Sequence, residues 1–428
     1  MALAFASSPS LEAPPPVEDA PPQWSAARRI GFRFLFVFLL LDLFPFPLGA
    51  FPYTDKAEEL YGDLWQKVAP WVSVHVLRLQ APISMLENGS GDRTYNYLLF
   101  FCFAGTAALA AAIWSALDLR PHHLRLEAGL RVYLRYFLGV VMIGYGVAKL
   151  FPGQFPSPPA SVLLGRVGDQ SPMRLLWTMM GFSRAYSIFG GALECLGGAL
   201  LFFRRTTLLG ALVLLGVLSN VLLLNFCYDV PVKLFSTLLL LLAAYLALPD
   251  ARRIADLFLR NRLVEPADAG APRLSPRGRR IWLVLKAATI ALMVGPIVWQ
   301  QWSFYRKPLP PLAGFYRVEQ FAGAKPWETV EVTGYGLFAR RTDGSRARFG
   351  LGPYDAAKKT LALKGSYADD TNVKSFVLTA TAPRDGELIL EGTLADGPFS
   401  VRLQRSARPV FLLETRGFHW INEYPYNR

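Results

Sequence analysis

Long apolar runs alternate with polar stretches through the larger, N-terminal part of the chain. An apolar run of about 18 residues or more matches the thickness of the bilayer hydrocarbon, so each run is expected to form a membrane-spanning helix. The pattern predicts seven spans, at 30–51, 95–117, 132–151, 186–203, 208–226, 232–248 and 281–299. Two amphipathic segments, 57–79 and 173–180, are expected to form helices between the spans.

A different pattern begins after residue 302. Short runs alternate apolar and polar residues, and turn signals such as Asp343-Gly344 and Asp385-Gly386 separate them. Asp-Gly between alternating runs indicates β-hairpins. We therefore expect about eight antiparallel strands in a small up-and-down barrel or a sandwich. The aromatic end, 416–425, is expected to pack on this domain or on the membrane surface, because an unattached tail frays.

These patterns predict an α-helical polytopic membrane protein with a C-terminal antiparallel β-barrel or sandwich. The expected parts are a disordered tail (1–25), two spans with an amphipathic segment on the outer face (26–128), a four-helix membrane bundle (129–250), a basic cytoplasmic loop (251–280), a seventh span (281–302) and a β domain (303–428). The tail is not expected to be a signal peptide, because it lacks a basic start and a continuous apolar core.

Composition and charge agree with a membrane protein. The chain is 52% hydrophobic and 18% charged, which excludes both an ordinary soluble globule and a disordered chain. Its net charge of +13 is concentrated beside alternate span ends, above all in 249–280. The positive-inside rule then places the N-terminus in the cytoplasm and the β domain outside, which is the periplasm in a bacterium. The basic residues are expected to contact lipid headgroups, and nucleic-acid binding is excluded.

Polar side chains inside the spans are the candidates for function, because charge at bilayer depth costs at least about 2.5–3.5 kcal/mol. Glu194 lies near mid-membrane, on one helix face with Gly190 and Gly198, where small residues let a neighbouring helix approach. Other polar residues fall at matching depth in the outer half: Tyr145, Lys149, Arg184, Asn220, Asn225, Asp229 and Lys233. Together they predict a polar pocket within the bundle that opens outward.

Structural interpretations of the same residues stay open. Lys149 with Asp229, or Arg184 with Glu194, are alternatively buried ion pairs that only fix the register of the helices. An unpaired Glu194 would have a raised pKa and could relay protons, whereas pairing with Arg184 or Lys149 would keep it ionised. Asp229 is also expected to cap the helix that follows it and to pair with Lys233 four residues later.

Two further segments are weaker candidates for a functional or capping role. Asp42 is a possible cap for a helix broken at Pro45. The turn at 89–92 is either an anion-binding nest or, more simply, a loop. Metal and dithiol chemistry are not expected, because Cys102, Cys195 and Cys227 lie far apart and no histidines have metal-ligand spacing.

The segment Leu134 to Asp250 resembles the DoxX/DoxD-like superfamily of four-helix membrane proteins. Two stretches carry the resemblance: Arg135 to Gly139 leading to Gly144-Tyr145-Gly146-Val147-Ala148-Lys149, and Gly191 to Leu201 around Glu194, followed by Arg204-Arg205-Thr206-Thr207. The resemblance implies redox or quinone chemistry at a helix bundle, with Lys149 and Glu194 as the residues that carry over. This chain lacks the paired cysteines of quinone-reducing thiol enzymes, so dithiol exchange is not expected.

Three functions are compatible with these features. In the first, the protein is a quinone-linked or redox-associated membrane component, in which Glu194 handles protons and Lys149 and Arg184 hold an anionic or quinonoid group. In the second, it is an accessory or scaffold subunit whose β domain binds a membrane or periplasmic partner protein or a lipid. The third, a small-solute or lipid transporter, lacks support from an inverted repeat.

Overall fold

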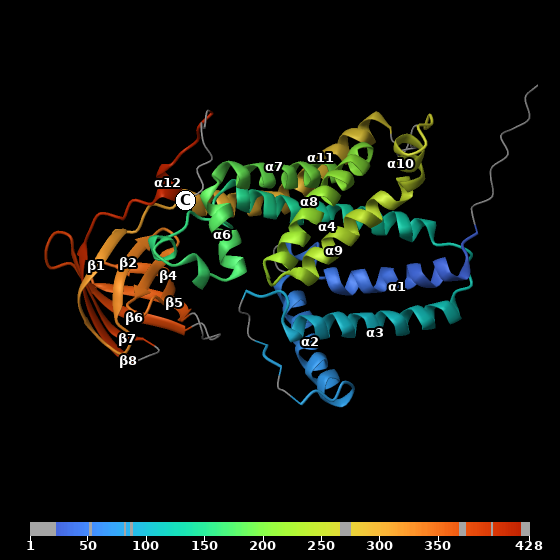
Figure 1. The fold of residues 1–428 in the computed structure, drawn as a ribbon. Helices are drawn as coiled ribbons and strands as arrows, with labels where there is room; N and C mark the ends of the chain where they lie inside the picture. The colour runs from blue at the N-terminus through green and yellow to red at the C-terminus, as the bar shows by residue number, and fades with distance from the viewer. Residues whose placement is uncertain are drawn as a thin grey trace, which may run out of the picture. The chain divides into compact units, whose positions relative to one another are not determined.

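Long helices make up the N-terminal part of the chain, and an antiparallel barrel follows them (Figure 1). The computed structural model describes residues 23–50, 54–80, 83–85, 89–265, 275–367, 374–394 and 397–420. In chain order the helices are α1 (Ala26–Leu43), α2 (Asp55–His75), α3 (Thr94–Leu117), α4 (Leu124–Leu150), α5 (Ala160–Leu163), α6 (Pro172–Phe182), α7 (Arg184–Leu201), α8 (Thr207–Cys227), α9 (Lys233–Ala247), α10 (Ala251–Phe258), α11 (Pro276–Tyr305) and α12 (Leu412–Thr415).

Five helices in the described residues are long and apolar enough to cross a membrane, which supports the prediction of a membrane protein. They are α3, α4, α8, α9 with the adjoining α10, and α11. The other two predicted spans correspond to α1 and α7, which have 18 residues each and carry charged side chains. Those charges lower the mean hydropathy of the two helices, so the count of seven spans stays a prediction.

Several predicted boundaries were wrong. Helix α1 ends at Leu43 rather than at residue 51, because Pro45 and Pro47 cannot continue a helix. The segment predicted as a basic loop, 251–280, contains α10 and the start of α11, and its residues 266–274 lie outside the described ones.

The chain divides into two units. The first unit comprises Met1–Asp42 and Phe103–Leu130, and the second comprises Leu43–Cys102 and Arg131–Arg428.

The first unit contains a buried arginine with hydrogen-bond partners from another segment. Arg33 on α1 is 2% exposed, and its Nε donates to Nε2 of His123 (3.2 Å). Its Nη2 donates to the carbonyl oxygen of Asp118 (2.6 Å). Burial lowers the pKa of His123 below its ordinary value, and the Arg33 guanidinium lowers it further. The neutral ring accepts the hydrogen bond from Arg33 through its Nε2.

The end of the predicted N-terminal tail belongs to this first unit. Trp24 is buried, and its ring packs edge-on against Phe32. The prediction of disorder is therefore wrong for residues 23–25, while residues 1–22 lie outside the described part. Asp42, in the last turn of α1, does not act as a cap, because a carboxylate caps the opposite, N-terminal end of a helix.

The second unit contains a helix bundle that depends on close glycine contacts. A Cβ on Gly146 of α4 would lie 2.6 Å from the carbonyl oxygen of Gly191 on α7. A Cβ on Gly198 of α7 would lie 2.8 Å from the carbonyl oxygen of Gly139. Helix α7 therefore lies backbone to backbone against α4, as small residues permit in membranes. The prediction that a neighbouring helix approaches closely at Gly190 was wrong, because nothing lies within 4 Å of a Cβ placed there.

The C-terminal domain is a closed barrel of eight antiparallel strands in chain order, with β1 pairing with β8. The strands are β1 (Gly314–Ala322), β2 (Trp327–Thr333), β3 (Gly336–Arg341), β4 (Arg346–Asp355), β5 (Thr360–Tyr367), β6 (Lys374–Thr381), β7 (Glu387–Leu394) and β8 (Gly397–Arg405). The barrel prediction is confirmed, and the sandwich alternative is not. Gly344 and Gly386 have positive φ in the predicted Asp-Gly turns.

Side chains fill the barrel interior. Its core contains Val330, Leu337, Phe349, Leu378 and Leu390, each with no exposed surface. The alternating pattern of the sequence put these residues on the inner face. The described residues of the barrel therefore form a packed core of their own, as in other small barrels.

A buried carboxylate joins the barrel to the segment before α6. Glu331 on β2 is 8% exposed and accepts a hydrogen bond from the backbone N–H of Ala160 (2.5 Å). Its other oxygen accepts from Arg408 (2.9 Å), which also donates to the carbonyl oxygen of Pro158 (3.2 Å). Phe418 and Trp420 are 77% and 91% exposed, so these two side chains do not pack on the barrel. The alternative that the aromatic end packs on the membrane surface stays a prediction, and residues 421–428 lie outside the described ones.

Candidate ligand-binding site

A large apolar cavity lies within the second unit, between α4, α7, α8 and α9. Its volume is about 660 Å³, within the usual range for ligand sites. Helix α6 and Phe155 line one end of it. Most of the lining is aliphatic or aromatic, and the polar side chains among the lining residues are few: Tyr145, Lys149, Gln154, Glu194, Asn220, Asn225 and Ser236, with Tyr186 and Trp177 at the edge of the apolar wall.

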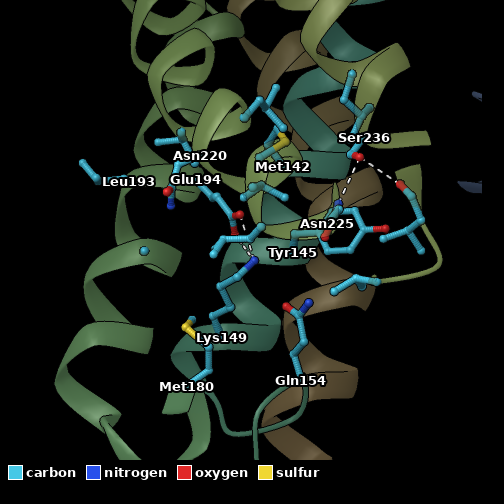
Figure 2. Close-up of a pocket in the computed structure, with 18 of the residues that line it drawn as sticks. Met142, Tyr145, Lys149, Gln154, Met180, Leu193, Glu194, Asn220, Asn225 and Ser236 are labelled. Carbon is cyan, nitrogen blue, oxygen red and sulfur yellow. Dashed lines mark hydrogen bonds and ion pairs between the residues drawn. The ribbon is translucent and has the colours of Figure 1, made fainter. Parts of the chain in front are cut away.

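A buried ion pair forms the polar centre of this cavity. Nζ of Lys149 donates to both carboxylate oxygens of Glu194, at 2.8 and 2.7 Å. The two residues are 7% and 2% exposed. Figure 2 shows the two side chains meeting head to head, Lys149 from α4 and Glu194 from α7. Of the two partners predicted to keep Glu194 ionised, Lys149 is the one found and Arg184 is not, and the Lys149–Asp229 pair does not form.

The close approach of α4 and α7 brings this pair together. A Cβ on Gly191 would lie 2.8 Å from Cβ of Lys149, so the lysine emerges directly over the glycine. Tyr145 lies one turn earlier on α4, with Nζ of Lys149 5.6 Å from its ring centroid. The aromatic face favours the cation at this position.

Gln154 is a functional candidate that sequence reasoning missed. Its side-chain Oε1 is buried and has no hydrogen-bond partner among the described residues. Figure 2 shows its amide directed into the same space as the Lys149–Glu194 pair. The residue lies in an uncharged, proline-rich loop, whose sequence carries no signal that it folds back over the cavity. A buried polar atom without a partner is costly, so this position favours a ligand that forms a hydrogen bond.

Asn225 and Ser236 form a second polar group on the lining. Nδ2 of Asn225 donates to Oγ of Ser236 (3.0 Å), and both residues are 5% exposed. Asn220 lies earlier on α8 and is an exposed residue of the lining. The predicted positions of Asn220, Asn225 and Tyr145 beside one pocket are thus found in the structure.

Three predicted site residues lie elsewhere. Arg184 donates to the carbonyl oxygens of Lys149 (3.0 Å) and Leu150, so it caps the C-terminal end of α4 instead of reaching Glu194. Asp229 is 82% exposed and pairs with Lys233 (2.8 Å), as the spacing predicts, but neither residue lines the cavity.

The N-terminus of α9 is capped from a distant segment. Asp92 accepts hydrogen bonds from the backbone N–H groups of Lys233 (2.8 Å) and Leu234 (3.0 Å). The predicted cap, Asp229, was therefore wrong. Because the Asp92 carboxylate itself occupies this helix end, the turn at 89–92 serves as a tether and not as a nest for an external anion.

Comparisons with known proteins give one relative. No protein-family model matches the chain, and no solved structure matches it. The uncharacterized protein YwoB of Bacillus subtilis (strain 168) is 32% identical over 137 residues, which are 32% of this chain and 83% of the relative. The chain therefore belongs to the same family as this Bacillus protein, through a region that makes up about a third of its length.

Proposed function

We propose that this protein is a quinone-linked membrane component that binds a membrane quinone in the cavity between α4, α7, α8 and α9. The observation that carries the proposal is the Lys149–Glu194 ion pair, held in the wall of an otherwise apolar cavity of about 660 Å³. Such a cavity suits a ligand that is largely apolar and has a few polar atoms on a ring.

The polar groups of the cavity fit a quinone and its reduced form. Glu194 accepts two of the three N–H protons of Lys149, which leaves one for a ring carbonyl oxygen. The free Oε1 of Gln154 accepts from a ring hydroxyl. Trp177 and Phe155, whose rings meet edge-on at 5.1 Å between centroids, offer flat apolar surface. A bound quinone supplies electron transfer coupled to proton transfer, and Glu194 is the residue placed to hold or move a proton.

The proposal is tested by extracting the purified protein with organic solvent and measuring quinone by mass spectrometry. Lys149→Met, Glu194→Gln and Gln154→Leu are compared with Lys307→Met, an exposed lysine beyond α11. We expect retained quinone to fall by about tenfold or more in the site variants, equivalent to the loss of one charged hydrogen bond. Equal quinone content in all four variants and the wild type overturns the proposal.

We further propose seven crossings, with the N-terminus in the cytoplasm and the barrel on the outer face of a bacterial inner membrane. Helices α1 and α7 have 18 residues, or about 27 Å at about 1.5 Å per residue, close to the hydrocarbon thickness. The close glycine contacts of α7 with α4 support its crossing beside a span-length helix. Reporter fusions at both ends test this topology, and reporters active on the same side contradict it.

The second candidate function, an accessory subunit, rests on the barrel. Because side chains fill the barrel, any binding role belongs to its outer surface. A partner protein that still co-purifies after deletion of residues 303–428 contradicts this role.

A further inference from the structure

The end of the cavity next to α6 is covered by a small apolar cluster. Phe155, Leu176, Met180 and Val230 are each less than 8% exposed and pack together, with Trp177 against them. They come from the loop after α4, from α6 and from the turn between α8 and α9. These side chains give the end of the cavity next to α6 an apolar cover.

The side of the cavity between α7 and α8 is different. On α7, Tyr186 and Phe189 line the cavity and are 45% and 60% exposed. On α8, the residues that are both exposed and in the lining are Leu212, Gly216 and Asn220, four residues apart and so on one helix face. On α4 and α9, the lining residues Met142 and Leu239 are 1% and 3% exposed, while Tyr145 is 37% exposed. Exposed lining residues on both α7 and α8 mark an opening of the cavity between these two helices.

The two helices pack closely near the connection between them. A Cβ on Gly197 of α7 would lie 2.5 Å from Leu214 on α8, and a Cβ on Gly210 would lie 2.9 Å from the carbonyl oxygen of Gly197. By contrast, nothing lies within 4 Å of a Cβ placed on Gly190 or Gly216. The open space thus begins about where Glu194 lies and continues toward the start of α7.

We infer that the ligand enters sideways from the bilayer through this opening, and that it is a lipid whose hydrocarbon tail lies between α7 and α8 beside Gly190 and Gly216. This inference rests on the proposed quinone binding and adds a tail site to it. Helix α8 is of span length, so the exposed sides of the opening face lipid. The lining at the opening is mostly apolar: Tyr186 and Phe189 contribute aromatic rings, Leu212 contributes an aliphatic side chain, and Asn220 contributes an amide. A ring held at Lys149 and Glu194 leaves its tail pointing out through this gap.

The glycines make a clean test possible. Gly216→Leu and Gly190→Leu place a side chain in the opening without a clash with another helix, because both sites have open space. Gly295→Leu on α11 is the matched control, since it too has nothing within 4 Å and does not line the cavity. Binding of menaquinone, which has an isoprenoid tail, is compared with binding of menadione, the same ring without a tail. Both are followed by quenching of tryptophan fluorescence in detergent.

We expect the two opening variants to weaken menaquinone binding by about tenfold or more while menadione binding changes less than about twofold, because the added side chain excludes only the tail. The control variant should bind both ligands as the wild type does. Equal weakening of both ligands, or no weakening of menaquinone, overturns the tail site while leaving quinone binding in place. A wild type that binds neither ligand overturns the proposed function itself.

Discussion

Substituting one residue of the Lys149–Glu194 pair should destabilise the protein more than substituting both. At 2.7 Å and an effective dielectric constant of about 20, the attraction is about 6 kcal/mol. Burial of two ions opposes this with several kcal/mol for each ion, so the net contribution of the pair is small. A single substitution leaves one charge buried without its partner. We therefore expect Lys149→Met or Glu194→Gln to lower the unfolding free energy by about 3–5 kcal/mol.

The measurement is detergent-induced unfolding in mixed micelles, followed by circular dichroism, on both single variants and on the double variant. The double variant should recover most of the loss, because it leaves no uncompensated charge, and it should still fail to retain quinone. Recovered stability without recovered binding separates the structural role of the pair from its role toward a ligand. Single effects that add to within about 0.5 kcal/mol would refute the reasoning, since independent sites behave in that way.

Three other features give predictions. Asp92→Ala should lower the unfolding free energy by about 0.5–2 kcal/mol, as loss of a helix cap does, while Asp229→Ala should have little effect on the same unfolding curve. Gly146→Ala should cost about 1–3 kcal/mol by forcing α4 from α7, whereas Gly144→Ala, with 3.8 Å to its nearest neighbour, should be tolerated. The third concerns pH. Because the pKa of His123 is lower in the folded state, the unfolded chain takes up the proton first. Stability of the first unit should therefore be full above pH of about 6.5 and fall as the pH drops below it, and His123→Gln should flatten the dependence. Hydrogen exchange at α1 across this range checks it, and an unchanged pH profile in the variant contradicts it.

Local patterns in the sequence were enough to predict much of the fold. Apolar runs identified the long helices, because backbone groups in a bilayer must be satisfied within each helix. Alternation and Asp-Gly turns identified the strands of the barrel, because side chains in a strand point alternately to two faces. That Tyr145, Lys149, Glu194, Asn220 and Asn225 lie at matching levels along their helices was also readable, since helical rise converts residue number into position along the axis.

Which polar residues meet was decided only by the tertiary structure. Lys149 and Glu194 are 45 residues apart, and Asp92 caps a helix that begins 141 residues later. Depth alone did not distinguish Glu194 from Asp229 as the partner of Lys149, because depth says nothing about rotation around a helix axis. The backbone contact at Gly146 and Gly191 sets that rotation, and it turns the carboxylate of Glu194 toward the lysine. The contact of α7 with α8 at Gly197 and Leu214, and the open space beside Gly190 and Gly216, likewise follow from tertiary packing that no local pattern records.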